Sequence, residues 1–213
     1  MDQKLKDMSE ALIKGQAPLV KELVQICLSN GVAPQEILSE GLIAGMNVIG
    51  KRFKKDEIFL PEVMIAARAM HAGLDILDPV LSESNIEPRG KIVLGTVRGD
   101  LHDVGKNLVS MMFRGAGFKV IDLGIDVPDE NFVDAVQENR PDILGLSALL
   151  TTTMPEMQKV IEALEEAGLK DQVKVIVGGA PIDQAFADTI GADGFGKDAV
   201  EAVQLARDLM AAK

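Results

Sequence analysis

The stretch KIVLGTVRGDLHDVGKN, residues 91–107, decides the fold of this chain. Its first part is apolar and rich in β-branched side chains, which predicts a buried strand over 91–97. A polar loop follows, and apolar side chains then recur at helical spacing over 104–116. A strand, a loop and a helix in this order begin a β–α–β unit, so a parallel sheet is expected.

The same alternation continues toward the C-terminus. Short apolar runs predict further strands at residues 119–124, 142–148, 173–179 and 193–195. The segments around them predict helices at 129–139, 155–168 and 181–190, with a last helix after the final strand. In such sheets helices cover both faces, and ligands bind beyond the carboxyl ends of the strands. We expect an α/β fold over residues 91–213, a Rossmann- or flavodoxin-like parallel-sheet domain.

The residues before this domain predict an N-terminal four-helix bundle. Pro18, Pro34 and Pro61 each stand in the first turn of an apolar-periodic segment, where the missing N–H of proline costs nothing. Short connections favour antiparallel packing. The expected helices span residues 2–14, 18–29, 34–53 and 60–81. The domains expected are therefore a helical bundle over 1–81, a polar linker and hinge over 82–90, and the sheet domain.

Composition excludes several classes of partner and site. The 213 residues carry 22 Lys and Arg against 33 Asp and Glu, a net charge of -11, with no Tyr or Trp. An acidic chain without basic blocks or aromatic stacking residues does not favour nucleic acid. No apolar run is long enough to span a membrane, so we expect a cytoplasmic protein. The single cysteine, Cys27, excludes an internal disulfide and a cysteine cluster, and its helical spacing predicts burial.

The loop after the first predicted strand carries the residues best suited to chemistry. It is not a phosphate loop, because five residues separate Gly99 from Gly105 and Asn107 stands where a Ser or Thr would hold magnesium. It offers D-x-H-x-x-G instead, in which His102 can ligate a metal. Asp100 can hold the other ring N–H and so select the tautomer.

A plainer reading of the same loop stays open, since a surface histidine held by a hydrogen bond also fits D-x-H. One protein ligand suits a metal whose other ligands belong to a cofactor such as a haem or a corrin. Asp103 can cap the next helix, and Gly105 would let a ligand pass close to the backbone. The other histidine, His71, lies within a predicted helix, and we interpret it as packed or half-exposed.

Small and polar residues also follow the third and fourth predicted strands. Ser147 ends the third strand, and the threonines at 151–153 come soon after it. Without a histidine beside them, these hydroxyls predict a hydrogen-bonding wall rather than a nucleophile. Gly178 and Gly179 end the fourth strand, where they can form a turn or leave a gap above the sheet.

Three elements together resemble the cobalamin-binding signature D-x-H-x-x-G, S-x-L, G-G. They are D-L-H-D-V-G at 100–105, S-A-L at 147–149 and G-G at 178–179. The resemblance implies cobalamin or a related corrinoid in its methylcobalt form, with His102 as the metal ligand. It also implies that the nucleotide tail leaves cobalt and descends into the sheet domain. The other cofactor-binding residues expected in this domain are Gly99, Asp100, Leu101, Asp103, Gly105, Ser147, Leu149, Thr151, Thr153, Gly178 and Gly179.

The first half resembles the helical cap of cobalamin-dependent methionine synthase and of small corrinoid proteins. The similar stretch is GMNVIGKRFKKDEIFLPEVMIAARAM, residues 45–70. It implies that Phe53 and Leu60 lie over the upper face of the corrin, with Val63 nearby and Glu40 at the rim. Ordinary bundle core is the alternative for these apolar side chains.

One departure from the methionine synthase pattern concerns a proton relay. There the aspartate and histidine continue to a serine, and the matching place in this chain is Thr153. Thr151 and Thr152 are the other candidates for it. A threonine keeps the hydroxyl, so the relay can survive.

The resemblance implies a corrinoid methyl-carrier protein with no catalysis of its own. A substrate-specific methyltransferase would move a methyl group from an O- or N-methylated substrate to cobalt. A corrinoid-to-acceptor methyltransferase would pass it to tetrahydrofolate or a thiol, and a reductive activator would serve the cofactor. No nucleic acid or membrane partner is expected. A cobalamin-dependent sensor, a mutase cobalamin subunit and a flavodoxin-like interaction domain are the alternatives.

Overall fold

A computed structural model describes residues 3–83 and 88–211 of the chain. The chain divides into two compact units. The helical unit comprises Met1–Arg89 with Met111–Gly117, and the sheet unit comprises Gly90–Ser110 with Phe118–Lys213. No helix in the described part of the chain is long and apolar enough to cross a membrane.

The helices of the helical unit follow the predicted pattern closely. They are α1 (Gln3–Ile13), α2 (Ala17–Ser29), α3 (Pro34–Glu36), η1 (Ile37–Ile43), α4 (Ala44–Lys54) and α5 (Leu60–Glu83). The helix expected at 34–53 is continuous through α3, η1 and α4, but its η1 segment is a π-helix. Because α5 runs through Glu83, the first two residues of the linker expected at 82–90 are helical. Residues 84–87 of that linker lie outside the described residues.

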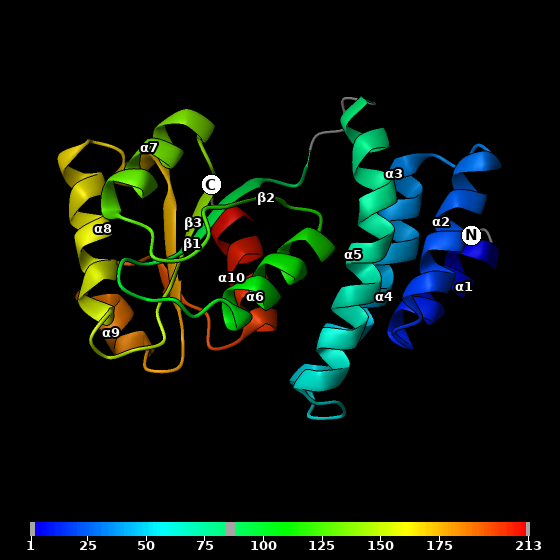
Figure 1. The fold of residues 1–213 in the computed structure, drawn as a ribbon, viewed down its shortest axis with the longest axis horizontal. Helices are drawn as coiled ribbons and strands as arrows, with labels where there is room; N and C mark the ends of the chain where they lie inside the picture. The colour runs from blue at the N-terminus through cyan, green and yellow to red at the C-terminus, as the bar shows by residue number, and fades with distance from the viewer. Residues whose placement is uncertain (1–2, 84–87, 212–213) are drawn as a thin grey trace. The chain divides into compact units, whose positions relative to one another are not determined.

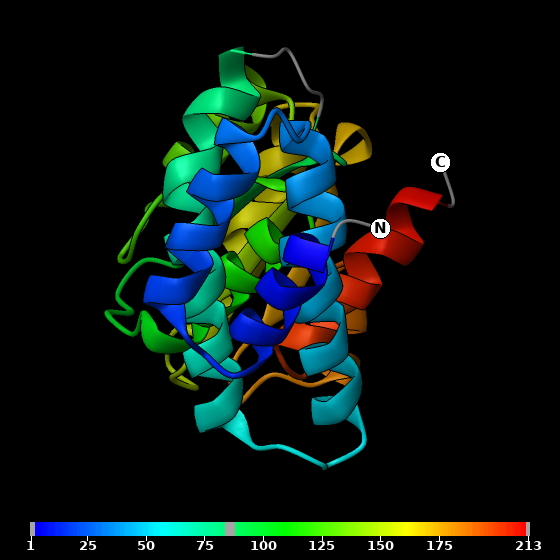
Figure 2. The same ribbon diagram turned by 90° about the vertical axis from the view of Figure 1, so that its right-hand side faces the viewer.

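Apolar stripes hold these helices together. α1 packs against η1 and α4, and α2 packs against α1 and α5 (Figure 2). Cys27 is fully buried, as predicted. A Cβ at Gly41 would stand 2.6 Å from Sδ of Met8, so this glycine allows η1 and α1 to approach closely. The buried side chains of α1 and α2 are Leu5, Met8, Ala11, Leu12, Val20, Leu23, Val24 and Cys27.

A parallel five-stranded sheet forms the centre of the sheet unit, which confirms the predicted fold class. The strands are β1 (Lys91–Thr96), β2 (Lys119–Asp122), β3 (Ile143–Ser147), β4 (Lys174–Gly178) and β5 (Gly194–Phe195). Their order in the sheet is β2-β1-β3-β4-β5. The helices are α6 (Val104–Gly115), α7 (Asp129–Asn139), α8 (Met154–Glu166), α9 (Gln184–Thr189) and α10 (Ala199–Ala211), with a short 3₁₀ turn, η2 (Lys170–Gln172).

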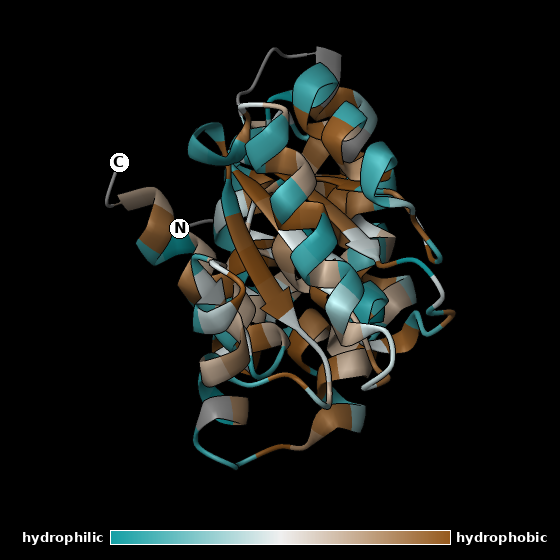
Figure 3. Cartoon of the chain, turned by 90° about the vertical axis from the view of Figure 1, so that its left-hand side faces the viewer, coloured by the Kyte–Doolittle hydropathy of each residue, from teal (hydrophilic) through white to brown (hydrophobic). Residues whose placement is uncertain are grey.

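Helices cover both faces of the sheet. Buried side chains of α7, α8 and α9 form one core with alternate residues of the strands, such as Val93, Leu144 and Val175. α6 and α10 lie on the opposite face (Figure 1). The strands are strongly hydrophobic, whereas the covering helices alternate between hydrophobic and hydrophilic residues (Figure 3). This pattern is the one expected of strands buried on both sides.

The strand order places the loops after β1 and β3 side by side. From β1 the chain passes to β2 at the edge of the sheet, whereas from β3 it proceeds the other way, to β4 and β5. At their carboxyl ends the two strands are neighbours, with Thr96 paired to Ser147. Such a switch in direction is where open α/β sheets bind their ligands.

Candidate functional site

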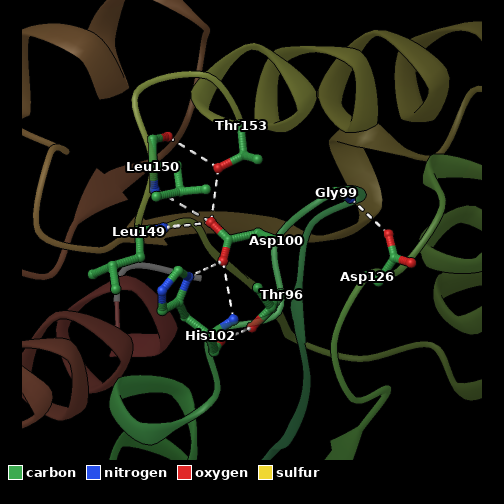
Figure 4. A network of polar contacts seen from close by, with 8 residues as sticks. All are labelled: Thr96, Gly99, Asp100, His102, Asp126, Leu149, Leu150 and Thr153. Atoms are coloured by element: carbon green, nitrogen blue, oxygen red, sulfur yellow. Dashed lines mark hydrogen bonds and ion pairs between the residues drawn. The ribbon is translucent and has the colours of Figure 1, made fainter.

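Asp100 and His102 lie together in the loop after β1. Nδ1 of His102 is 2.7 Å from Oδ1 of Asp100, and the same oxygen accepts the His102 backbone N–H at 3.0 Å (Figure 4). The Asp100 side chain is fully buried, whereas the His102 side chain is 50% exposed. The loop therefore anchors the histidine on a buried carboxylate and leaves half of the ring open to solvent.

The loop after β3 holds the second oxygen of Asp100. Oδ2 accepts the N–H of Leu149 at 2.7 Å and that of Leu150 at 3.3 Å. The Thr153 hydroxyl lies 2.7 Å from the same oxygen. Burial by itself would raise the pKa of the Asp100 carboxyl, but the hydrogen bonds from Leu149, Thr153 and His102 outweigh it and lower the pKa. The ionised carboxylate thus bridges the loops after β1 and β3.

This network selects one tautomer of His102. An ionised carboxylate only accepts hydrogen bonds, so the ring N–H that faces Asp100 is on Nδ1. Nε2 then carries the lone pair with which a neutral imidazole ligates a metal. Among the described residues, no group of three or more His, Cys, Asp or Glu side chains could hold a metal ion. A metal at His102 would need its other ligands from a cofactor.

Both units match known families. Residues 90–204 and residues 4–78 each match a B12 binding domain family. A corrinoid protein of Desulfitobacterium hafniense is 46% identical over 97% of each chain. The chain belongs to the corrinoid protein family. Dimethylamine corrinoid protein 1 of Methanosarcina acetivorans is 51% identical over 84% of each chain. The methanol:cobalamin methyltransferase complex of Methanosarcina barkeri has a TM-score of 0.88 at 32% identity, covering 100% of this chain and 81% of that chain.

The glycines of the corrinoid signature differ in what surrounds them. A Cβ at Gly105 would meet no atom within 4 Å, so the backbone there can be approached by a ligand. Gly179 has a φ of 139°, and its Cβ would stand 1.8 Å from the carbonyl oxygen of Ala148. A Cβ at Gly178 would lie 3.1 Å from the Gly196 carbonyl oxygen. The chain's own backbone therefore requires a glycine at 179, whereas the space beside Gly105 is open.

Other residues expected to bind the cofactor lie in or beside the loops after β1 and β3. Leu101 is 68% exposed and Leu149 is 41% exposed, and Leu149 lies close to the His102 ring (Figure 4). Ser147 is partly buried at the end of β3, and Thr151 is exposed. Asp103 precedes α6, and its carboxylate accepts a hydrogen bond from an amide side chain one turn later. The half-exposed ring of His102 therefore lies beside exposed apolar surface.

Three of the predicted cap residues, Phe53, Leu60 and Val63, belong to the end of α4 and the first turn of α5, whose connection lies at one end of the helical unit (Figure 2). Phe53 is partly buried near the end of α4. Leu60 begins α5 and is 47% exposed, whereas Val63 is 1% exposed. Glu40 is exposed on η1. Val63 is thus part of the bundle core, and Leu60 offers exposed apolar surface.

Two residues outside the signature also hold the corrinoid protein's His102 loop. Oγ1 of Thr96 donates to the His102 carbonyl oxygen at 3.0 Å, and Oδ1 of Asp126 accepts the N–H of Gly99 at 2.6 Å. Neither was among the residues expected from the sequence. Only their position could have indicated them in the sequence. Thr96 ends β1 and Asp126 lies in the loop after β2, at the edge of the sheet where ligands bind.

Proposed function

We propose that this protein carries methyl groups between partner methyltransferases on a corrinoid that His102 ligates. The Asp100–His102 pair carries the proposal, because it presents one nitrogen ligand of fixed tautomer at the switch in strand order. Relatives named for dimethylamine and trimethylamine, and a relative in a methanol:cobalamin methyltransferase complex, support an O- or N-methylated donor. A sensor or a mutase subunit would not account for these relatives.

The chain's own residues would ligate the cobalt of the corrinoid and orient the ligating imidazole. When bound, the corrinoid supplies a cobalt ion that takes up a methyl group and gives it away. His102 would bind that ion through Nε2 in place of the nucleotide tail, while Asp100 holds the imidazole at Nδ1. Thr153 is buried with its hydroxyl on Asp100, whereas Thr151 and Thr152 are exposed, so we assign the third place in the relay to Thr153. These three groups would hold a proton whenever His102 is not ligating.

The remaining signature residues would receive the cofactor. The loop after β1 would lie under the corrin, with the exposed side chain of Leu101 against the ring. In the helical unit, Phe53 and Leu60 would keep water from the upper face, and Val63 would support them from the core. We assign the nucleotide tail to residues at or after the ends of β1, β3 and β4, namely Gly105 in the first turn of α6, Ser147, Leu149, Gly178 and Gly179.

Partners would provide the substrate chemistry. One methyltransferase would hold the methylated donor, and a second would hold the acceptor, tetrahydrofolate or a thiol. A reductive activator would return the cofactor to its active state. The linker expected at 82–90 would allow the helical unit to move aside for each partner.

The proposal is tested by measuring whether His102 ligates the cobalt of a bound corrinoid. Protein reconstituted with hydroxocobalamin is reduced to the Co(II) form and examined by electron paramagnetic resonance. If a histidine nitrogen is the axial ligand, labelling of histidine with nitrogen-15 should change the splitting by that ligand from a triplet to a doublet. His102→Ala should abolish this change, whereas His71→Ala should keep it, since His71 is an exposed residue of α5 beside Asp75. A splitting that ignores the label, or survives in His102→Ala, would contradict the proposal.

A further inference from the structure

Asp126 makes two hydrogen bonds to the backbone of Gly99 and Asp100, close to His102. Its Oδ1 accepts the N–H of Gly99 at 2.6 Å, a contact drawn as a dashed line in Figure 4. Its own N–H donates to the carbonyl oxygen of Asp100 at 3.0 Å. Both ends of the Gly99–Asp100 segment are therefore tied to one residue of the loop after β2.

The backbone of Asp126 has an unfavourable conformation where it makes these two hydrogen bonds. Its φ is 52°, in the left-handed region, which aspartate and asparagine tolerate better than most other residues. Gly99, whose N–H donates to the Asp126 side chain, also has a positive φ of 78°. Such conformations persist where surrounding contacts demand them, and they concentrate at functional sites.

Asp100 is thus held from two directions. Donors after β3 hold its carboxylate, through the N–H of Leu149 and the hydroxyl of Thr153. Asp126 holds its main chain from the β2 side. The direction of the Asp100 side chain, and with it the position of His102, depends on both attachments, because a carboxylate that shifts carries the bonded imidazole with it.

We propose that Asp126 is a positioning residue that aims Nε2 of His102 at the metal. The inference rests on the proposed function, since it assigns a role in the same ligation. The Asp126 side chain is exposed, so its replacement opens no cavity in the core and the variants are expected to fold.

Three substitutions of Asp126 separate the effect of its carboxylate from the effect of its strained backbone. Asp126→Ala removes the acceptor, and Asp126→Gly removes it while relieving the left-handed φ. Asp126→Asn keeps an oxygen acceptor and tolerates the same φ. If the side-chain bond to Gly99 matters, the alanine and glycine variants should behave alike and the asparagine variant should resemble the wild type.

The first readout uses the protein without corrinoid. In the wild type, the His102 Nδ1–H should give a downfield proton resonance protected from exchange by Asp100. Asp126→Ala and Asp126→Gly should broaden or shift it, and Asp126→Asn should restore it. Melting temperatures recorded in parallel detect a general loss of structure. An unchanged resonance in the alanine and glycine variants would overturn the inference, even if their melting temperatures fall.

The second readout uses protein loaded with hydroxocobalamin. Asp126→Ala and Asp126→Gly should lower the equilibrium constant for histidine ligation by about 3- to 10-fold, less than the ~10- to 100-fold loss of affinity from removing a direct partner of a metal ligand. Wild-type ligation by His102 with no change in the variants overturns the role of Asp126 and leaves the proposed function intact. Absence of His102 ligation in the wild type overturns the proposed function instead, and the resonance of the corrinoid-free protein still decides whether Asp126 positions the ring.

Discussion

Asp100 accepts five hydrogen bonds in a fully buried position, two at Oδ1 and three at Oδ2. Its acceptor capacity is used by groups from two loops, so hydrogen bonds compensate the buried charge. Removal of any donor leaves the buried charge less well satisfied. At the scale of single residues, the orientation of His102 therefore depends on the donors that hold Asp100.

Thr153 allows this dependence to be measured. Thr153→Val should lower the free energy of unfolding by about 1.5 to 3 kcal/mol, the contribution of a hydrogen bond to a charged group. Thr153→Ser is the matched control, because it keeps the hydroxyl and should cost about 1 kcal/mol or less for the lost methyl group. Urea unfolding of the three proteins measures both values. Equal stabilities for the two variants would show that the hydroxyl does not hold Asp100.

The signature glycines should respond in opposite ways to alanine. Gly179→Ala should destabilise the protein by about 3 kcal/mol or more, because its Cβ would collide with the Ala148 carbonyl at a positive φ. Gly105→Ala should leave the corrinoid-free protein as stable or up to about 1 kcal/mol more stable, since the space beside it is open and it lies in a helix. Thermal unfolding of both variants tests this. A harmless Gly179→Ala would refute the close approach of the β3 and β4 ends.

At the scale of elements, Asp193 joins the starts of β4 and β5 to η2. Its carboxylate accepts from Lys170 at 2.9 Å, from Lys174 at 2.8 Å and from the Val175 N–H at 2.8 Å. Burial raises the pKa of the Asp193 carboxyl, but these partners outweigh burial and lower it. The hydrogen bond with Asp193 in turn raises the pKa of Lys174. A strand of two residues is thus held at its start by a charge cluster.

This cluster predicts a pH dependence of known sign. Because the folded-state pKa of Asp193 is lowered, its stabilisation is complete above its ordinary pKa of 3.8 and is lost as pH falls below it. Asp193→Asn should therefore lower the free energy of unfolding by about 1 to 3 kcal/mol near neutral pH, with a difference that shrinks below about pH 4. Because the pKa of Lys174 is raised, its contribution should also fade above about pH 10.5. A difference between wild type and variant that stays constant in acid would contradict the lowered pKa.

The π-helical segment Ile37–Ile43 shows where element prediction stops. Apolar spacing predicted a helix over 34–53, and a continuous helix is present. A π-helical turn interrupts an α-helix without ending it, so apolar periodicity over 34–53 still predicts a helix. Tertiary contacts distinguish them, since η1 packs on α1 and Gly41 lies against Met8.

At the scale of the whole molecule, the site unites residues that are far apart in sequence. Asp100 meets Leu149 and Thr153, about fifty residues later, and its backbone is tied to Asp126 from a third loop. The strand order makes this possible, because β1 lies between β2 and β3 and the three loops leave the same edge. The site therefore forms only when the sheet has formed.

By itself the sequence determined the alternation of strands and helices, the helical N-terminal half and the corrinoid signature with its Asp100–His102 pair. These features are local, because each depends on apolar periodicity or on residues a few positions apart. Only the tertiary structure decided that Thr153, rather than Thr151 or Thr152, meets Asp100, and that Thr96 and Asp126 hold the loop. The physical reason is that these contacts depend on which strands are neighbours and on where each side chain points at the sheet edge, and neither is encoded in the spacing along the chain.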